Sequence, residues 1–479
     1  MTTLRLLSSL LGLCGLCASW PEEAPVAVEP TTALLVTQIP HDVRGALPGL
    51  GRERARTPPP GARIVRLDLA RPTEEPKVYV AGFRSAAWPD VSADGRRFLF
   101  VGQRSEGDAF QVWEARVDGG APRQVTQGTS DCLEALYLST LFTLDAQAPR
   151  ERLGFCRRSA AGETALFTCA PDGSDEQRIT YHPGGGGGPL LLEDGRLLFR
   201  VDQVPGAAPR PTPLAELLLV NVDGTDVQAF TAPAPEGVQR SRPCATPDGR
   251  VLWLEQRADA DDPRLVGVAR VRAFGPRSEL AVHAAGELHA LIVLADGSLV
   301  VARRPTDAPA AACELWRLDA ASGNFTARLC ATSDWDVLDA TPLGPRPARP
   351  GRSSVVDETR KSGFLYCIDS RIGRDGDTLR SAASLELLAW SASGEHVLGR
   401  APVEHDGSFY LEVPVRTPLR VRALDTEGHA LEEMQSWIWV MPREARGCIG
   451  CHEDPELAPP NRQPRALRKR PFSMMEPTK

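Results

Sequence analysis

The sequence predicts an all-β protein: a six-bladed β-propeller, then a small antiparallel β-sandwich-like domain and a short C-terminal segment. Two observations predict the propeller, namely a hairpin signature that recurs about every fifty residues and a second hairpin between its copies. A third observation, alternating apolar and polar sequence over 363–442 without that period, predicts the second domain. The 42 glycines and 42 prolines favour many turns and therefore short strands.

Each repeat begins with an Asp-Gly turn that is followed by an apolar run typical of a β-strand. These turns stand at 94–95, 194–195, 248–249 and 296–297, and a degenerate copy is centred on Asp145. The second hairpin of the repeat lies at 115–126, 169–180, 220–231 and 316–329. Two hairpins make four strands, and four-stranded units with this spacing predict propeller blades.

The two ends of the repeat region predict how the propeller closes. Residues 62–83 form a hairpin before the first full repeat, and residues 334–345 form a lone strand after the fifth. Joined, they make a sixth, composite blade that leaves no edge strand open, so we expect the propeller over 62–345. The Asp-Gly repeats resemble those of TolB-like propellers. A β-sandwich with similar hairpins is the alternative, but it gives no reason for a fifty-residue period.

The glycine run "YHPGGGGGPL" at 181–190 lies where one blade passes to the next. It lacks the Lys and Ser/Thr with which phosphate-binding loops hold phosphate and magnesium. We therefore expect a flexible loop between blades.

The first residues predict export. Arg5 precedes the apolar run from Leu6 to Cys17, which is too short to span a bilayer, and small residues follow it. We assign 1–19 to a signal peptide and expect a periplasmic or other extracytoplasmic protein. A buried first helix is the alternative. A lipoprotein anchored through Cys17 is less favoured, because Leu16 stands where such signals need a small residue.

The remaining boundaries follow from composition. We expect a Pro-rich N-terminal segment over 20–61, a Pro/Arg-rich linker over 346–362, the β domain over 363–442, and a motif-bearing segment with a basic tail over 443–479. No further stretch is long and apolar enough to be a transmembrane segment. The net charge of −7 gives no reason to expect nucleic acid or an anionic membrane as partner.

Seven cysteines lie outside the signal and the C-terminal motif, and an oxidising compartment would allow some of them to form disulfides. Cys156 and Cys169 flank one expected hairpin turn, and Cys313 and Cys330 flank another. Cross-strand bridges and buried thiols both fit this arrangement. Because seven is odd, at least one of these cysteines has no partner among them.

The segment "GCIGCHED" contains Cys448, Cys451 and His452 in the order C-x-x-C-H. Zinc usually needs a second ligand pair, which the sequence lacks, and a redox disulfide would need a thioredoxin-like context. One covalent haem c fits best, because two thiols at this spacing add to the haem vinyl groups and the next histidine ligates the iron. We expect Cys448 and Cys451 to attach the haem and His452 to be its axial ligand.

The flanks of the motif supply further candidates. The apolar run "WIWVMP" at 437–442 is suited to a haem wall. Five basic residues follow the motif, and they fit two interpretations equally well, as partners of the haem propionates or as an ordinary solvated tail: Arg462, Arg465, Arg468, Lys469 and Arg470. The sixth iron ligand stays open among Met434, Met441, Met474, Met475, His405 and His429. A methionine would favour electron transfer, whereas an open position would bind a small molecule.

The stretches "LYCIDS", "APVEHDGSFYLEVP", "PLRVRALDTEGHAL" and "SWIWVMPREARGCIGCHEDPELAPPN" resemble the hydrazine synthase alpha-subunit middle-domain family of exported haem proteins. The resemblance is strong over about 363–470 and architectural over the propeller, which precedes the middle domain in that family too. It implies that Cys448 and Cys451 are thioether attachments and that His452 is the motif histidine.

Two departures from the family weigh against hydrazine synthesis. The synthase subunit has a further domain with a second haem, and it uses a tyrosine just after the motif at its iron while its motif histidine binds zinc. Residues 453–457 here are Glu, Asp, Pro, Glu and Leu, and the sequence ends at Lys479 with one motif.

Three functions fit the sequence. The favoured one is a mono-haem cytochrome-like protein that exchanges electrons with a redox partner protein. The others are a haem enzyme acting on a small nitrogen or oxygen species, and a propeller that binds a ligand or a protein. Neither a Ser-His-Asp order nor a carboxylate pair in the sequence supports an enzyme that works without haem.

Overall fold

The structure, a computed structural model, describes most of the chain. The described residues are 31–46, 57–72, 74–201, 216–231, 234–235, 237–257, 263–270, 275–283, 286–305, 310–372, 382–450 and 461–475. The predicted signal peptide and the motif residues Cys451 and His452 lie outside them. No helix in this described part is long and apolar enough to cross a membrane.

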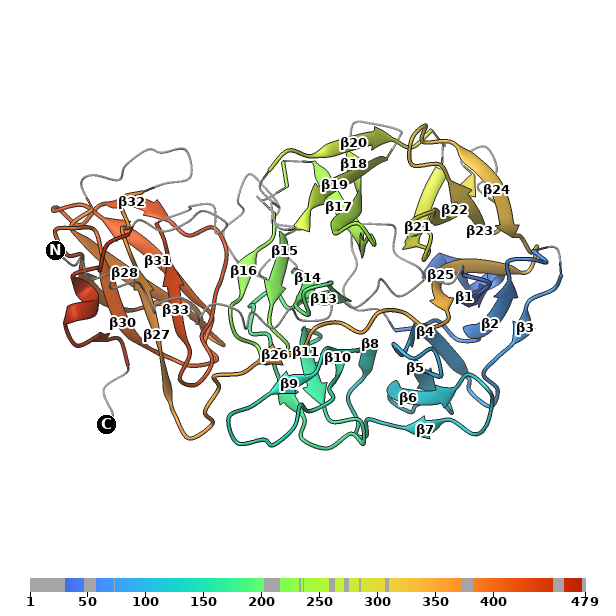
Figure 1. Cartoon of the computed structure of the whole chain (residues 1–479), viewed down its shortest axis with the longest axis horizontal. Helices are drawn as coiled ribbons and strands as arrows, with labels where there is room; N and C mark the ends of the chain where they lie inside the picture. The colour runs from blue at the N-terminus through green and yellow to red at the C-terminus, as the bar shows by residue number, and fades with distance from the viewer. Residues whose placement is uncertain are drawn as a thin grey trace, which may run out of the picture.

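Six four-stranded antiparallel sheets stand around a central axis as the blades of a propeller, seen in Figure 1. In blades 1, 3, 4 and 5 the strand nearest the axis is followed by a tight turn at Asp-Gly, as the repeated signature predicts. From the axis outward, blade 1 consists of β4 (Ser85–Val91), β5 (Arg97–Gln103), β6 (Gln111–Arg116) and β7 (Arg123–Gln124). Blade 2 consists of β8 (Cys132–Tyr137), β10 (Leu153–Arg158), β11 (Thr164–Cys169) and β12 (Gln177–Arg178). Blade 3 consists of β13 (Gly187–Leu191), β14 (Leu197–Val201), β15 (Glu216–Val220) and β16 (Gln228–Ala229).

The next two blades have the same order. Their strands are β17 (Val238–Ala245), β18 (Arg250–Arg257), β19 (Arg264–Ala269), β20 (Ser278–Ala281) in blade 4, and β21 (Gly286–Val293), β22 (Leu299–Pro305), β23 (Glu314–Leu318), β24 (Phe325–Cys330) in blade 5. The predicted fold class, a six-bladed propeller with a second β domain, is confirmed.

Blade 6 is composite and closes the ring. Its inner strand β25 (Trp335–Leu343) comes from the end of the propeller sequence, and it pairs with β1 (Ala33–Pro40), which pairs with β2 (Arg63–Asp68) and then β3 (Lys77–Val78). Leu34, Val36, Val337 and Ala340 of this blade are buried in one apolar cluster together with residues of blade 5. The lone strand and the hairpin that the sequence placed in this blade are both there.

The strand between them was missed. Residues 33–40, "ALLVTQIP", lie inside the segment predicted as Pro-rich over 20–61, yet they form β1 and every residue from Ala33 to Ile39 is buried. The propeller therefore begins before residue 62. A short 3₁₀ helix, η1 (His41–Ala46), follows β1.

The glycine run is packed rather than flexible. Residues 181–187 are buried, and the last glycines enter β13. His182 is enclosed, its Nδ1 accepts a hydrogen bond of 3.1 Å from the backbone N–H of Gly184, and burial lowers the pKa of its imidazole to about 3. The expectation of a flexible loop was wrong, because glycine here lets the backbone pass close to Phe199 and Thr164.

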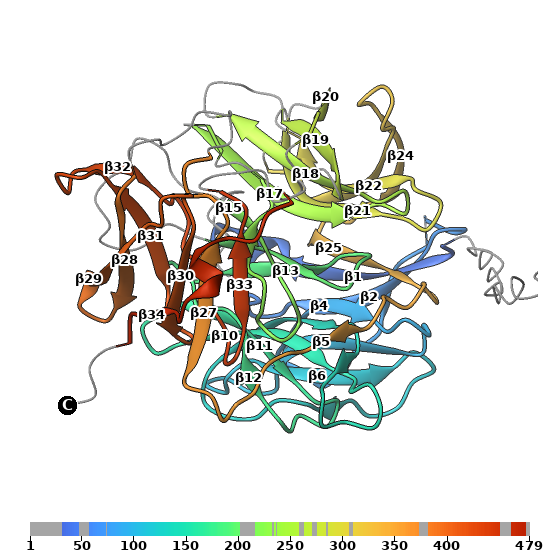
Figure 2. The same ribbon diagram turned by 60° about the vertical axis from the view of Figure 1, so that its left-hand side comes forward.

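The second domain is a sandwich of two four-stranded sheets that lies beside blades 2 and 3 (Figures 1 and 2). One sheet has the order β29 (Gly394–Pro402), β28 (Ser384–Ser391), β31 (Leu419–Leu424), β32 (Ala430–Glu433). The other has the order β33 (Ala445–Cys448), β27 (Ser362–Cys367), β30 (Phe409–Pro414), β34 (Phe472–Ser473), and η3 (Ala466–Arg468) precedes β34.

The sandwich differs from the prediction in one respect. It is not wholly antiparallel, because β33 and β34 pair in parallel with β27 and β30. Both of these edge strands come from the segment 443–479 that the sequence set apart from the β domain. The described parts of that segment, 443–450 and 461–475, therefore belong to the sandwich.

The linker crosses one mouth of the propeller before it reaches the sandwich (Figure 1). The backbone N–H of Arg346 donates to Ala93, and a Cβ on Gly95 or Gly195 would meet the linker backbone at 2.6 or 2.5 Å. Beyond this crossing, β26 (Arg352–Ser353) pairs in parallel with β9 (Leu141–Phe142) of blade 2. The linker thus packs on the Asp-Gly turns of blades 1 and 3 as it passes from blade 6 to the sandwich.

Candidate functional site

Cys448, the first cysteine of the motif, ends the edge strand β33. It is half-buried, and the carbonyl of Cys448 accepts a hydrogen bond of 3.0 Å from the N–H of Ile368 at the end of β27. β33 is the edge strand of its sheet, and Ile449 and Gly450 follow it before the described residues break off. Cys451 and His452 lie outside the described residues, so their predicted roles stay predictions.

Asp369 holds the chain on both sides of the segment 451–460. Its backbone N–H donates to the carbonyl of Ile449 at 3.1 Å, just before that segment. Its carboxylate Oδ2 lies 2.7 Å from Nη2 of Arg462, just after it. Asp369 therefore fixes both ends of the ten-residue segment that contains the rest of the motif.

The carboxylate of Asp369 is buried and ionised. Burial by itself raises its pKa, but hydrogen bonds from the side chains of Arg371 and Arg462 and from the backbone of Arg371 hold the pKa below its usual value. Gly407 turns tightly over the same carboxylate with φ +83°, where a Cβ would lie 1.9 Å from Oδ1. Only glycine fits this approach.

Asp406 provides a second anchor for the tail. Its carboxylate accepts hydrogen bonds from Ser408 Oγ at 2.7 Å and from the backbone N–H of Arg465 at 2.9 Å. Burial opposes ionisation, but these hydrogen bonds together with the charge of Arg462 lower the pKa of Asp406 to about 2.

This lowered pKa predicts an acid-sensitive tail. A group whose pKa falls on folding stabilises the fold above its unfolded pKa, and that stabilisation disappears as pH falls through the folded value. After allowance for solvent screening, we expect Asp406 to contribute about 1 kcal/mol that is lost between about pH 4 and pH 2. Urea unfolding at a series of pH values should give a shallower acid limb for Asp406→Asn than for the wild type. Identical limbs would contradict this role.

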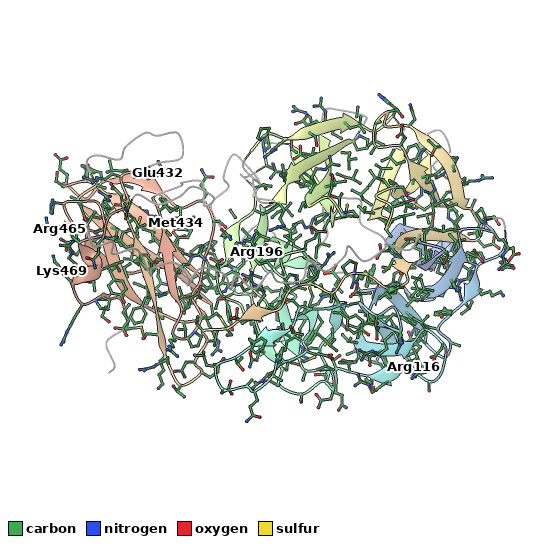
Figure 3. All side chains as sticks on the ribbon, viewed as in Figure 1. Arg116, Arg196, Glu432, Met434, Arg465 and Lys469 are labelled. Carbon is green, nitrogen blue, oxygen red and sulfur yellow. The ribbon has the colours of Figure 1, made fainter. Side chains whose placement is uncertain are left out.

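Three of the five basic residues of the tail contact protein groups on the outer side of the sandwich. Arg462 pairs with Asp369, Arg465 contacts His405, and Lys469 pairs with Glu404. Figure 3 shows Arg465 and Lys469 on the side away from the propeller. Arg468 and Arg470 are exposed. Arg462, Arg465 and Lys469 therefore have partners within the protein that do not involve haem propionates.

The candidates for a sixth iron ligand are scattered over the domain. Met441 packs against Gly224 of the propeller, Met474 is buried against Gly399, and Met434 packs on the domain core. His405 contacts Arg465, and His429 lies in an exposed turn. Met475 follows β34 and is half-buried. The described residues do not single out one of them.

The apolar run 437–442, which the sequence suggested as a haem wall, packs within the sandwich and against the propeller. Trp437 packs edge-on against Trp390 with a centroid separation of 5.7 Å, and the guanidinium of Arg420 lies over its ring. Trp439 and Met441 face the propeller. These contacts, all within the sandwich core or at the domain interface, explain why the run is apolar.

The domain interface is built around the β15–β16 turn at 221–227. The indole N–H of Trp439, which is fully buried, donates to the carbonyl of Gly224 at 2.9 Å, and its ring meets Tyr181 edge-on at 6.0 Å. Gly224 has φ +85°, and a Cβ there would lie 3.1 Å from the sulfur of Met441. A single propeller turn therefore inserts between side chains of the sandwich.

Glu444 joins this interface to the motif strand, because it directly precedes β33. Its buried carboxylate accepts hydrogen bonds from the N–H groups of Asp226, at 2.8 Å, and Met441, at 2.6 Å. Burial raises the pKa of Glu444 above its usual value, although Arg446 and the two N–H groups oppose the shift. The carboxylate of Glu444, next to the start of β33, therefore binds the β15–β16 turn of the propeller.

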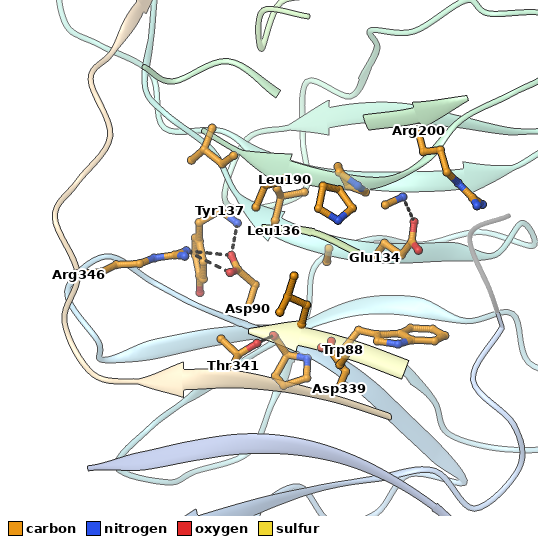
Figure 4. Close-up of a pocket in the computed structure, with 18 residues that line it drawn as sticks. Trp88, Asp90, Glu134, Leu136, Tyr137, Leu190, Arg200, Asp339, Thr341 and Arg346 are labelled. Carbon is orange, nitrogen blue, oxygen red and sulfur yellow. Dashed lines mark hydrogen bonds and ion pairs between the residues drawn. The ribbon is translucent and has the colours of Figure 1, made fainter. Parts of the chain in front are cut away.

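Sequence reasoning did not find a cavity of about 280 Å³ at the propeller axis (Figure 4). All six inner strands contribute to its lining, and each carries a one-residue bulge. At two of the bulges a non-glycine residue, Trp88 or Glu134, has positive φ and lines the cavity. At the linker end, Arg346 pairs with Asp90 at 3.1 Å. Bulges of this kind have no sequence signal beyond a slightly long strand.

Among the described residues, one group of three metal-ligating side chains lies close together: Asp425, Glu427 and His429. They occupy the exposed β31–β32 turn and do not include Cys448. Three of the cysteines that the sequence placed about hairpin turns, Cys156, Cys169 and Cys330, are buried, and Cys156 donates to Glu134. The register places Cys156 opposite Leu166 and Cys169 opposite Leu153, so these two cysteines do not face each other across their hairpin.

A propeller joined to a sandwich whose edge strand ends in a C-x-x-C-H motif defines a class of two-domain protein with a candidate covalent cofactor site. Residues 370–453 match the family "Hydrazine synthase alpha subunit middle domain". The chain is 32% identical over 123 residues to the hydrazine synthase subunit alpha of Kuenenia stuttgartiensis. That alignment covers 25% of this chain and 15% of the relative.

Solved structures extend the likeness to the propeller. Hydrazine synthase from Kuenenia stuttgartiensis superposes with a TM-score of 0.76 at 17% identity, over 92% of this chain and 72% of that chain. TolB from Acinetobacter baumannii gives a TM-score of 0.44 at 13% identity, over 64% of this chain and 66% of that chain, which is too weak to carry an argument. The chain is therefore similar to hydrazine synthase subunit alpha in its matched middle domain, and it shares the fold of a propeller followed by that domain, as the sequence resemblance predicted.

Proposed function

We propose that this chain is an exported, mono-haem c-type cytochrome-like protein that exchanges electrons with a redox partner protein. The observation that carries the proposal is the C-x-x-C-H motif, whose first cysteine is the last residue of β33 inside the family-matched domain. Bound there, a haem would supply a one-electron couple. A periplasmic or other extracytoplasmic location is part of the proposal, since covalent haem is attached outside the cytoplasm.

The residues of the chain fit such a group. Cys448 presents a half-buried thiol at the end of the edge strand β33, and Asp369 contacts Ile449 before the segment 451–460 and Arg462 after it. In the proposal, Cys448 and Cys451 are the thioether attachments and His452 is the iron ligand. The domain contacts at Trp439 and Glu444 keep β33 in place against the propeller.

The alternative is a haem enzyme that acts on a small nitrogen or oxygen species. The observation that favours it is the relative itself, which is named as a subunit of a synthase. Residues 453–457 contain no tyrosine, which weighs against hydrazine synthesis and leaves His452 as the proposed iron ligand. The propeller cavity would suit a third role in ligand binding.

Expression with cytochrome c maturation factors tests the proposal. We expect a pyridine haemochrome spectrum of one covalent haem, lost in the double variant Cys448→Ser/Cys451→Ser and kept in Cys330→Ser, whose thiol is buried in blade 5. His452→Ala should keep the attachment but change the iron spin state. A wild type without covalent haem would overturn the proposal. A high-spin ferric spectrum that shifts with nitric oxide or hydroxylamine would favour the enzyme.

A further inference from the structure

Cys367 lies directly beside Cys448 on the neighbouring strand. The parallel pairing of β27 and β33 matches Phe364 with Ala445 and ends with Cys367 opposite Cys448. Neighbouring strands lie about 4.8 Å apart, within the range of about 4.4–6.8 Å that disulfides span between Cα atoms. The sequence alone gave no sign of this, because the two cysteines are eighty-one positions apart.

Both side chains point to the same face of the sheet. Alternate residues of β27 are buried, and Cys367 is among them with an exposure of 1%. Cys448 packs against the same apolar core from the edge strand. Residues opposite each other in a register share a face, so the two sulfur atoms lie on the core side of one sheet.

We propose that Cys367 and Cys448 form a disulfide when the chain carries no haem, so that Cys367 acts as a resolving thiol for the motif. The inference rests on the proposed function only in assigning Cys448 to haem attachment. The bond itself depends on register and on an oxidising compartment.

The chemistry balances with a disulfide oxidant, such as a thiol oxidase or oxidised glutathione. The half-buried Cys448 loses its proton and attacks a sulfur of the oxidant, and one oxidant thiol leaves. Cys367 then attacks Cys448 in the mixed disulfide, and the second oxidant thiol leaves. The two cysteines give up two electrons and two protons, and one oxidant disulfide becomes two thiols. A dithiol reductant reverses the exchange and returns Cys448 to the haem-attachment reaction.

The test uses the full exported chain, made without haem maturation factors, trapped by alkylation and mapped by mass spectrometry. We expect a cross-linked peptide pair containing Cys367 and Cys448, and its loss in Cys367→Ser but not in Cys330→Ser. In haem-loaded protein, Cys367 should be recovered alkylated. Co-expression with maturation factors but limiting reductant should give a larger haem-loaded fraction for Cys367→Ser than for the wild type.

Three results would overturn the inference. One is a bond between Cys448 and Cys451 in its place, another is full alkylation of both thiols under the same oxidant, and the third is bound zinc that protects them. The peptide map of the wild type decides the matter even if Cys367→Ser fails to fold. Failure of the proposed function is a separate result, because a chain that never takes up haem can still form this disulfide.

Discussion

Replacing Trp439 by alanine should cost about 3–5 kcal/mol of unfolding free energy and release the sandwich from the propeller. The side chain is fully buried between the two domains, where its indole N–H is hydrogen-bonded to Gly224 and its ring contacts Tyr181. Its removal leaves a large cavity and one unpaired carbonyl. Because native proteins are stable by only about 5–15 kcal/mol, this is a large fraction of the total.

Two measurements separate this effect from ordinary core damage. Urea unfolding gives the loss of free energy, and limited proteolysis in the linker 346–362 reports on release of the sandwich. Trp439→Phe should keep most of the packing and lose only the hydrogen bond, about 1 kcal/mol. Trp253→Ala, a fully buried tryptophan inside the propeller, is the matched control and should lower stability without faster cleavage of the linker. Equal linker cleavage in both variants would show that Trp439 is not specific to the interface.

The sequence predicted those parts of the fold that have local signals. The repeated Asp-Gly turns predicted the hairpins of the blades, and the lone strand at 334–345 predicted a composite blade. The strand β1 was missed because its partner β25 is about three hundred residues away, and pairing over that distance has no local signal. The parallel pairing of β33 was missed for the same reason.

The surroundings of the candidate site were less predictable than its motif. The C-x-x-C-H spacing predicts roles for Cys448, Cys451 and His452, because the chemistry of covalent haem fixes that spacing. The sequence could not show that the apolar run 437–442 contacts the propeller, since an apolar side chain fits a haem or a neighbouring domain equally well. Asp369 carried no signal, because its importance comes from one backbone hydrogen bond and one ion pair with residues that it meets only in the folded chain.

Asp369→Ala should have the second largest effect, with a loss of about 2–4 kcal/mol and a loosened segment 451–460. The buried carboxylate accepts hydrogen bonds from Arg371 and Arg462, and its removal leaves two guanidinium groups without their shared counter-ion. Arg462 would then no longer hold the far end of the segment. Urea unfolding measures the loss, and limited proteolysis within 451–460 measures the loosening.

Asp425→Ala is the matched control, because its carboxylate also accepts backbone N–H groups but lies in the β31–β32 turn, and we expect it to cost no more than about 1 kcal/mol. Asp369→Asn should fall between the wild type and Asp369→Ala, since an amide keeps the shape but loses the charge that pairs with both arginines. If Asp369→Ala unfolds like the wild type, or cleaves within 451–460 no faster than Asp425→Ala, the two ends of the segment are held by other contacts. The carboxylate would then be a local partner of Arg371, and the pairing of β33 with β27 would be the contact that positions Cys448.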